Sequence, residues 1–273
     1  MLLQGFVVVR GALSAAELQL FNEQVDENDP SHGRPDGGIP AAEALAMMAD
    51  PDSFEGKDKQ VGFGDGVPTL GTHPCFDTLI AHPGWIEHIR TFVDSPGFRG
   101  ASCIIRWPGQ ASRLHSGGHT GSLATQFAYL NGEFHCGAIN VMVALNDCPL
   151  GGGGTGIVPG SHKSSIAHPA YAPGGTPQRG WKDRQNPRDG QTSGGFMDGA
   201  VNAMEIALDA GDALIFVDSV VHGSTCRTLP GSRRTLILNY GPDLGARWHP
   251  PTELAERLPA AALEWVAAPP AKL

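Results

Sequence analysis

The feature that most constrains the fold is a succession of short apolar runs between residues 101 and 241, separated by clusters of glycine, proline, asparagine and aspartate. The length of these runs and the turn-forming residues between them are typical of strands in an antiparallel sandwich or barrel. We therefore expect a mainly β fold. The runs are ASCIIRW (101–107), TQFAYL (125–130), CGAINVMVALND (136–147), TGIVPGS (155–161), DALIFVD (212–218) and RRTLILNYG (233–241).

Helical patterns flank this region on both sides. The segment LSAAELQLFNEQVDEN (13–28) begins with a capping box, because Glu17 follows Ser14 by three residues. The segment GFVVVRG before it has the composition of a strand. The segment HPGWIEHIRTFVDS (82–95) has the pattern of a second amphipathic helix, and we expect one or two helices in PPTELAERLPAAALEWVAAPP (250–270).

Two long segments lack a strand pattern. Residues 29–74 are rich in glycine, proline and aspartate around a short helical pattern at 41–49. Residues 169–203 interrupt the series of strands and are too long for a plain connector. We expect residues 169–203 to form a lid or substrate loop within one domain that spans residues 1–273.

Composition excludes several classes of protein. A net charge of −9 argues against a nucleic-acid-coating surface, and no apolar run is long enough for a membrane helix. The start of the chain has no signal-peptide pattern. The five cysteines are odd in number and contain no C-x-x-C pair, which favours buried thiols in a reducing compartment. We therefore expect a cytoplasmic protein without a nucleic-acid or membrane partner.

The segment DSVVHGSTCRTLPGSRRTLILNY carries the first sign of chemistry. His222 follows an apolar strand, and Arg233 begins the next one 11 residues later. A hairpin between these strands would bring both side chains into one cavity. A buried guanidinium needs an anionic partner, and its fork suits a carboxylate. The pair predicts a metal-ligating histidine beside a carboxylate-binding arginine; the alternative is a surface histidine and a surface arginine.

The order of motifs resembles the phytanoyl-CoA dioxygenase family from about Gly5 to Tyr240, most specifically at NVMVALND, GGTGIVPGSHK and GDALIFVDSVVHGS. Members are iron(II)- and 2-oxoglutarate-dependent enzymes on a double-stranded β-helix, a jelly roll of the cupin kind. The resemblance implies that His222 is the distal iron ligand and that Arg233 binds a carboxylate of 2-oxoglutarate, assisted by Ser224. Arg234 is the alternative to Arg233, since neighbours on a strand point to opposite faces.

The stretch RLHSGGHTG (113–121) departs from the family pattern. By the order of motifs His115 is the proximal iron ligand, but Gly117 stands where the family carries Asp or Glu. One reading of Gly117 is a tight turn, with a third ligand from elsewhere or from water. The other is an open coordination position that a halide fills, as in the iron(II)/2-oxoglutarate halogenases that this motif resembles. His119 we assign to the surroundings of the metal or to a substrate contact.

Weaker patterns concern the cosubstrate and the substrate. Asn140 on a core strand and Arg106 at the end of another are further candidates for the 2-oxoglutarate pocket. Within 169–203, four basic side chains predict an anionic group on the substrate; the alternative is a solvated loop. These side chains are Arg179, Lys182, Arg184 and Arg188.

Together these residues predict a non-haem iron(II)/2-oxoglutarate-dependent oxidoreductase that acts on an unactivated C–H bond of a small molecule. The reaction would be hydroxylation, or halogenation with chloride beside Gly117. The alternative from another class is a cupin-like binding protein that has lost catalysis together with its carboxylate.

Overall fold

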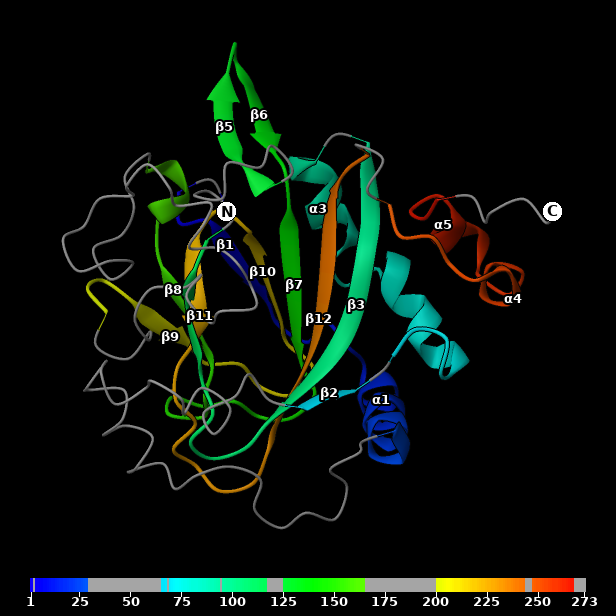
Figure 1. The fold of residues 1–273 in the computed structure, drawn as a ribbon, viewed down its shortest axis with the longest axis horizontal. Coiled ribbons are helices and arrows are strands. Elements are labelled where there is room, and N and C mark those ends of the chain that lie inside the picture. The colour runs from blue at the N-terminus through cyan, green and yellow to red at the C-terminus, as the bar shows by residue number, and fades with distance from the viewer. Residues whose placement is uncertain are drawn as a thin grey trace, which may run out of the picture.

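The computed structural model describes residues 1, 3–28, 65–67, 69–93, 95–116, 125–164, 200–243 and 247–267. Within these ranges most strands form two facing antiparallel sheets, and most helices lie outside the larger one (Figure 1). The larger sheet has the strand order β1-β10-β7-β12-β3-β2, and the smaller sheet has the order β4-β11-β8-β9. This arrangement confirms the expected mainly β, jelly-roll fold with flanking helices.

The strands are short, as the apolar runs predicted. The larger sheet contains β1 (Phe6–Val9), β2 (Asp65–Val67), β3 (Pro96–Arg106), β7 (Ile139–Ala144), β10 (Ala213–Val217) and β12 (Arg233–Pro242). The smaller sheet contains β4 (Ser112–His115), β8 (Thr155–Val158), β9 (Met204–Ile206) and β11 (Val221–Ser224). A separate hairpin of β5 (Phe127–Leu130) and β6 (Glu133–Cys136) projects from the body of the molecule (Figure 1).

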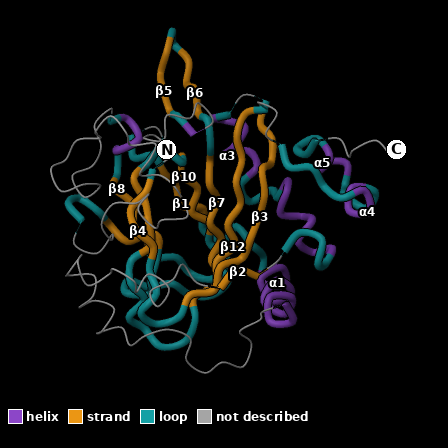
Figure 2. Tube along the Cα trace, viewed as in Figure 1, coloured by secondary structure: helices purple, strands orange, loops and turns teal. Residues whose placement is uncertain are grey.

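All of the described helices except one gather on the outer side of the larger sheet, and the exception follows β8 of the smaller sheet (Figure 2). In the capping box of α1, the Ser14 backbone N–H donates to Glu17 Oε2 at 2.8 Å, and the Glu17 N–H donates to Ser14 Oγ at 3.3 Å. The described helices are α1 (Ala15–Asn28), the 3₁₀ helix η2 (Pro74–Ala81), α3 (Ile86–Phe92), the 3₁₀ helix η5 (Ser161–Lys163), α4 (Thr252–Ala255) and α5 (Ala260–Leu263).

Side-chain alternation along β12 decides what faces each layer. Leu236 and Leu238 are fully buried in the core that includes Phe21 of α1. Arg234 points to the same side, because its Nη2 lies 2.5 Å from Asp26 Oδ1 on α1. Arg233 points to the opposite side, into the space between the two sheets. The register therefore turns one arginine inward and its neighbour outward.

The structure differs from the sequence prediction in one respect that matters for the site. The hairpin expected between the strands of His222 and Arg233 is wrong, because β11 belongs to the smaller sheet and β12 to the larger. The chain crosses from one sheet to the other between them, so the two side chains approach from opposite layers. The helix expected at 41–49 and residues 169–199 of the expected lid lie outside the described residues.

Most of the buried apolar side chains join one core cluster that reaches from α1 to the C-terminal helices. This supports the single domain over residues 1–273, which stays a prediction. All five cysteines are buried free thiols. Within the described ranges, the structure contains no helix with the length and apolar character needed to span a bilayer.

We predict that Tyr240→Phe lowers the free energy of unfolding by about 1–3 kcal/mol. Tyr240 is fully buried, accepts a hydrogen bond from Trp85 Nε1 at 2.9 Å and donates one to the Leu79 carbonyl at 2.9 Å. Both partners would lose that bond inside the core. Urea denaturation measures the change, and Tyr129→Phe on the exposed hairpin is the matched control with an expected change within about 0.5 kcal/mol. Equal stability of both variants would contradict this role.

Candidate active site

Two histidines meet on adjacent strands of the smaller sheet. His115 ends β4, His222 lies in β11, and their Cα atoms are partners in the antiparallel ladder. The ring centroids are 4.0 Å apart, with the ring planes tilted by 57°. His222 is buried whereas His115 is exposed, so the pair lies at the boundary between interior and surface. Imidazoles placed this close together can share a metal ion.

The orientation of the His222 ring is set by the backbone. Its Nδ1 lies 2.8 Å from the Val220 carbonyl, which can only accept, so Nδ1 carries the proton and donates. The lone pair is then on Nε2, which leaves that atom available as a ligand. Burial, and after it the neighbouring His115, lowers the pKa of His222 well below its ordinary value, although the Val220 carbonyl opposes this. His222 is therefore neutral, as a metal ligand must be.

The pair has two imidazole donors and no third side chain of the usual kinds nearby in the described part of the chain. Among those residues, no group of three or more His, Cys, Asp or Glu side chains could hold a metal ion. Gly117 and His119, which the sequence analysis assigns to the surroundings of the metal, lie outside the described residues.

Two buried arginines face this region from the larger sheet. Arg233 on β12 and Arg106 on β3 are Cα partners in the ladder, so their side chains leave the sheet on the same face. Both reach across to the smaller sheet. Arg233 Nη2 lies 3.4 Å from Thr155 Oγ1, and Arg106 Nη1 donates to Ser224 Oγ. Arg233 Nη1 also donates to the Gly153 carbonyl at 2.8 Å.

The electrostatics of the two arginines favour an anionic ligand. Burial, and after it the charge of Arg233, lowers the pKa of Arg106 to about 9. Burial lowers the pKa of Arg233 as well, against the opposing effect of Cys148 and Glu205. Arg233 Nε is buried without a hydrogen-bond partner. Two desolvated guanidinium groups and one unused donor form a site that a carboxylate can neutralise.

Hydroxyl groups from the smaller sheet surround the arginine pair. Ser224 Oγ lies 3.2 Å from Ser112 Oγ, which also accepts a hydrogen bond from the Ser224 backbone N–H at 2.8 Å. Thr155 is the Cα partner of Ser224 on β8. The structure thus brings together His115, His222, Ser224, Arg106 and Arg233 from the sequence prediction.

Asn140 lies elsewhere in the space between the sheets. It pairs with Asn239, six residues along β12 from Arg233. Its Nδ2 donates to Asp218 Oδ1 at 2.7 Å, and its Oδ1 accepts from Asn239 Nδ2 at 2.5 Å. The structure therefore gives the buried amide polar partners, as expected, but separates it along β12 from the arginine end.

Sequence reasoning missed three parts of the site. Thr155 and Ser112 supply hydroxyl groups, and the glycine run at 151–154 supplies the carbonyl that holds Arg233. The run itself was a usable signal, because carbonyls of a glycine turn are accessible to a neighbouring side chain. No pattern distinguished Ser112 from other strand serines.

A comparison with known protein families shows to which family the chain belongs. The sequence matches the family described as Phytanoyl-CoA dioxygenase (PhyH) over residues 1–235. The chain belongs to this family. Membership confirms the predicted family and the enzyme class, that of iron(II)/2-oxoglutarate-dependent enzymes, while the resemblance to the halogenases stays a prediction. A comparison with curated proteins gave no match.

Solved structures share the fold. HygX from Streptomyces hygroscopicus with nickel and 2-oxoglutarate bound is 19% identical, with a TM-score of 0.59 over 90% of this chain and 85% of that one. HygX with nickel, 2-oxoglutarate and hygromycin B bound is 18% identical, with a TM-score of 0.62 over 90% and 86%. SnoK, a non-haem α-ketoglutarate-dependent carbocyclase from nogalamycin biosynthesis, is 18% identical, with a TM-score of 0.52 over 88% and 80%. At these identities the similarity is one of fold.

We predict that His222→Ala weakens iron(II) binding by at least about a hundredfold, since loss of an outer partner of a metal ligand already costs ten- to a hundredfold. An anaerobic iron(II) titration measures the affinity, and circular dichroism checks the fold. His135→Ala on the exposed β6 is the matched control and should bind like the wild type. Wild-type affinity in His222→Ala would show that His222 is not a ligand.

Proposed function

We propose that the protein is an iron(II)- and 2-oxoglutarate-dependent oxidoreductase that acts on an unactivated C–H bond of a small molecule. The observation that carries this proposal is the pairing of Arg233 with Arg106 between the sheets, opposite the two adjacent histidines. A dicarboxylate cosubstrate needs a cationic anchor at one end and a metal at the other. Within the family to which the chain belongs, this combination supports 2-oxoglutarate as the ligand.

Each side chain has a separate role in the proposed site. His115 and His222 hold iron(II), with Nε2 of His222 as its donor atom. Arg233 and Arg106 bind the remote carboxylate of 2-oxoglutarate, and Ser224 supplies a hydroxyl to it. When bound, iron(II) and 2-oxoglutarate would together activate dioxygen, which is the oxidant of the C–H bond, while the protein would fix their orientation and exclude water from the buried end. HygX, which shares the fold, was solved with nickel and 2-oxoglutarate bound, in support of this assignment.

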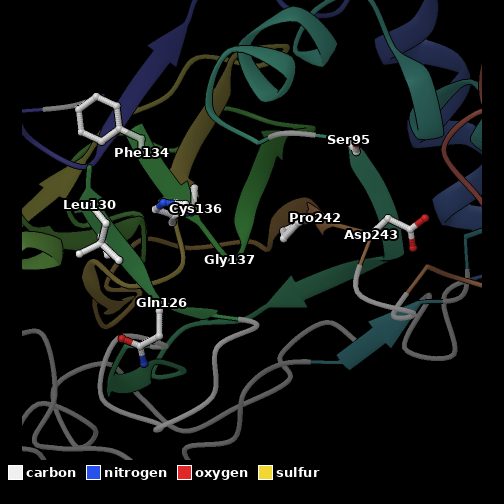
Figure 3. Close-up of a pocket in the computed structure, with 10 residues that line it drawn as sticks. Ser95, Gln126, Leu130, Phe134, Cys136, Gly137, Pro242 and Asp243 are labelled. Carbon is white, nitrogen blue, oxygen red and sulfur yellow. The ribbon is translucent and has the colours of Figure 1, made fainter. Parts of the chain in front are cut away.

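A pocket near the projecting hairpin is a suitable place for the non-reacting part of a substrate. It has a volume of about 530 Å³, within the range of small-molecule sites, and lies between the hairpin and the outer ends of β3 and β12 (Figure 3). Leu130, Phe134 and Pro242 give it apolar walls, while Gln126 and Asp243 add polar groups. HygX was also solved with hygromycin B bound, which supports a small-molecule substrate here.

The charge of the substrate is a finer part of the proposal. The basic side chains predicted to meet an anionic group belong to 169–203, and all four lie outside the described residues. Among the described residues, the pocket lining contains Asp243 and no arginine or lysine. An anionic group of the substrate would therefore lie towards the loop and a neutral or apolar part in the pocket.

We predict that Arg233→Ala weakens 2-oxoglutarate binding by roughly ten- to a hundredfold, about 1.5–3 kcal/mol, because a buried charge-assisted contact is lost. Arg234→Ala is the control, since Arg234 pairs with Asp26 on the outer face. Anaerobic titration of the iron(II) protein, followed by the metal-to-ligand charge-transfer band, measures both affinities. Equal effects would contradict the assignment. Absence of the band in the wild type would favour the cupin-like binding protein instead.

The choice between halogenation and hydroxylation depends on what fills the coordination position of the metal that Gly117, two residues after His115, leaves open. The sequence places Gly117 where a metal-binding carboxylate is usual, and no third donor from the described residues joins the histidines. An iron(II) site with only two neutral protein ligands retains positive charge that a chloride ion can neutralise. This supports a halide position beside Gly117, and halogenation as the reaction; hydroxylation follows if water or another residue fills that position.

We predict that a crystal of the iron- and 2-oxoglutarate-bound protein soaked in bromide shows an anomalous peak for a bromide ion bound to the metal beside Gly117. Gly117→Asp should remove that peak and shift the products towards hydroxylation, because a carboxylate would take the coordination position of the halide. Mass spectrometry of the products follows the shift. An Asp or Glu side chain bound to iron at that position in the wild type would exclude the halogenase reading.

A further inference from the structure

A carboxylate lies behind the turn that holds Arg233. Glu205 is half-buried on β9, the edge strand of the smaller sheet. Its Oε1 accepts a hydrogen bond from the Gly154 backbone N–H at 2.7 Å, and its Oε2 accepts one from the Gly151 N–H at 2.9 Å. Both oxygens are therefore bonded to the same four-residue turn, in charge-assisted contacts that are stronger than neutral ones.

The opposite side of the turn faces arginines. The Gly153 carbonyl accepts from Arg233 Nη1 at 2.8 Å, and the Gly152 carbonyl accepts from Arg227 Nη1 at 2.7 Å. The turn thus presents N–H groups to one carboxylate and carbonyls to two guanidinium groups. The Gly154 N–H and the Gly153 carbonyl belong to the same peptide group, so the carboxylate that accepts from this N–H polarises the group and strengthens the Gly153 carbonyl as an acceptor for Arg233.

Glycine is needed in this turn for steric and conformational reasons. Gly151 and Gly153 have φ values of +79° and +78°, which side chains rarely adopt. A Cβ at Gly154 would lie 2.9 Å from both Glu205 Cγ and the Ile206 carbonyl oxygen. The close approach between Glu205 and the turn therefore depends on the glycine run, so a side chain in the run would disturb the contacts of Glu205.

We infer that Glu205 is a positioning residue for 2-oxoglutarate: it fixes the 151–154 turn so that the Gly153 carbonyl holds Arg233 in place for the cosubstrate carboxylate. This inference rests on the proposed function. Glu205 hydrogen-bonds to the turn and makes no described hydrogen bond to the histidines or to an arginine guanidinium, although its charge also acts on Arg233 across the turn. Its loss is therefore expected to affect 2-oxoglutarate and to spare iron.

The direct test is Glu205→Gln, which keeps the size of the side chain but loses its charge and places an amide N–H₂ against a backbone donor. Calorimetric titration of 2-oxoglutarate into the anaerobic iron(II) protein should show affinity reduced by about tenfold. Iron(II) affinity, measured without 2-oxoglutarate, should stay within twofold of the wild type. Equal 2-oxoglutarate affinity in variant and wild type would overturn the inference.

Asp212→Asn is the matched control for a general loss of stability. Asp212 also accepts from two backbone N–H groups, those of Gly11 and Asp209, each at 2.9 Å, but it anchors a turn at the β1–β10 edge. Urea denaturation of the metal-free variants gives the stability of each. Asp212→Asn should leave 2-oxoglutarate affinity unchanged. A similar loss of 2-oxoglutarate affinity in both variants would reduce Glu205 to a structural role and overturn the inference.

A double-mutant cycle tests the route through Arg233. In the Arg233→Ala background, Glu205→Gln should have no further effect on 2-oxoglutarate affinity, whereas additive losses would contradict the inference. If Glu205→Gln does not fold, Gly154→Ala disturbs the same contact from the turn and should weaken 2-oxoglutarate in the same way. A wild type that binds iron but no 2-oxoglutarate would overturn the proposed function and this inference with it.

Discussion

The arrangement of the site depends on the burial of the Arg233 guanidinium between the two sheets. A charged group there is costly unless it has acceptors, and the smaller sheet supplies Thr155 while the glycine turn supplies the Gly153 carbonyl. Neither acceptor is charged, and Arg106 beside it adds a second positive group. The space between the sheets is therefore polarised in favour of an anion at this end, where the packing is polar and not fully apolar.

The two sheets contribute different chemistry. The smaller sheet holds the imidazoles on paired strands, where the ladder fixes the spacing of their rings. The larger sheet holds both arginines on paired strands, where the ladder fixes a shared direction. Strand pairing within each sheet thus positions each half of the site. The hydrogen bonds from Arg106 to Ser224 and from Arg233 to Thr155 join the two halves.

Much of this could be predicted from sequence because the signals were local. The capping box of α1, the strand runs and the alternation that separates Arg233 from Arg234 each depend on neighbours within a few residues. The sheet to which β11 belongs could not be predicted in this way, because a crossing between layers has no local pattern and a hairpin explains the same spacing. Strands as short as β4 and β9 also escape periodicity, although β4 carries His115.

The division of the site between two sheets has a consequence for how such a protein can diversify. In the proposed site, the two arginines that would bind the remote carboxylate of 2-oxoglutarate belong to the larger sheet, whereas the two histidines that would hold the metal belong to the smaller sheet. On this proposal, a substitution beside β4 would alter the surroundings of the metal while the arginines on β3 and β12 stay in place for the cosubstrate. One scaffold can in this way support several reactions, each reached through a few substitutions near the metal and without changes to the cosubstrate-binding arginines.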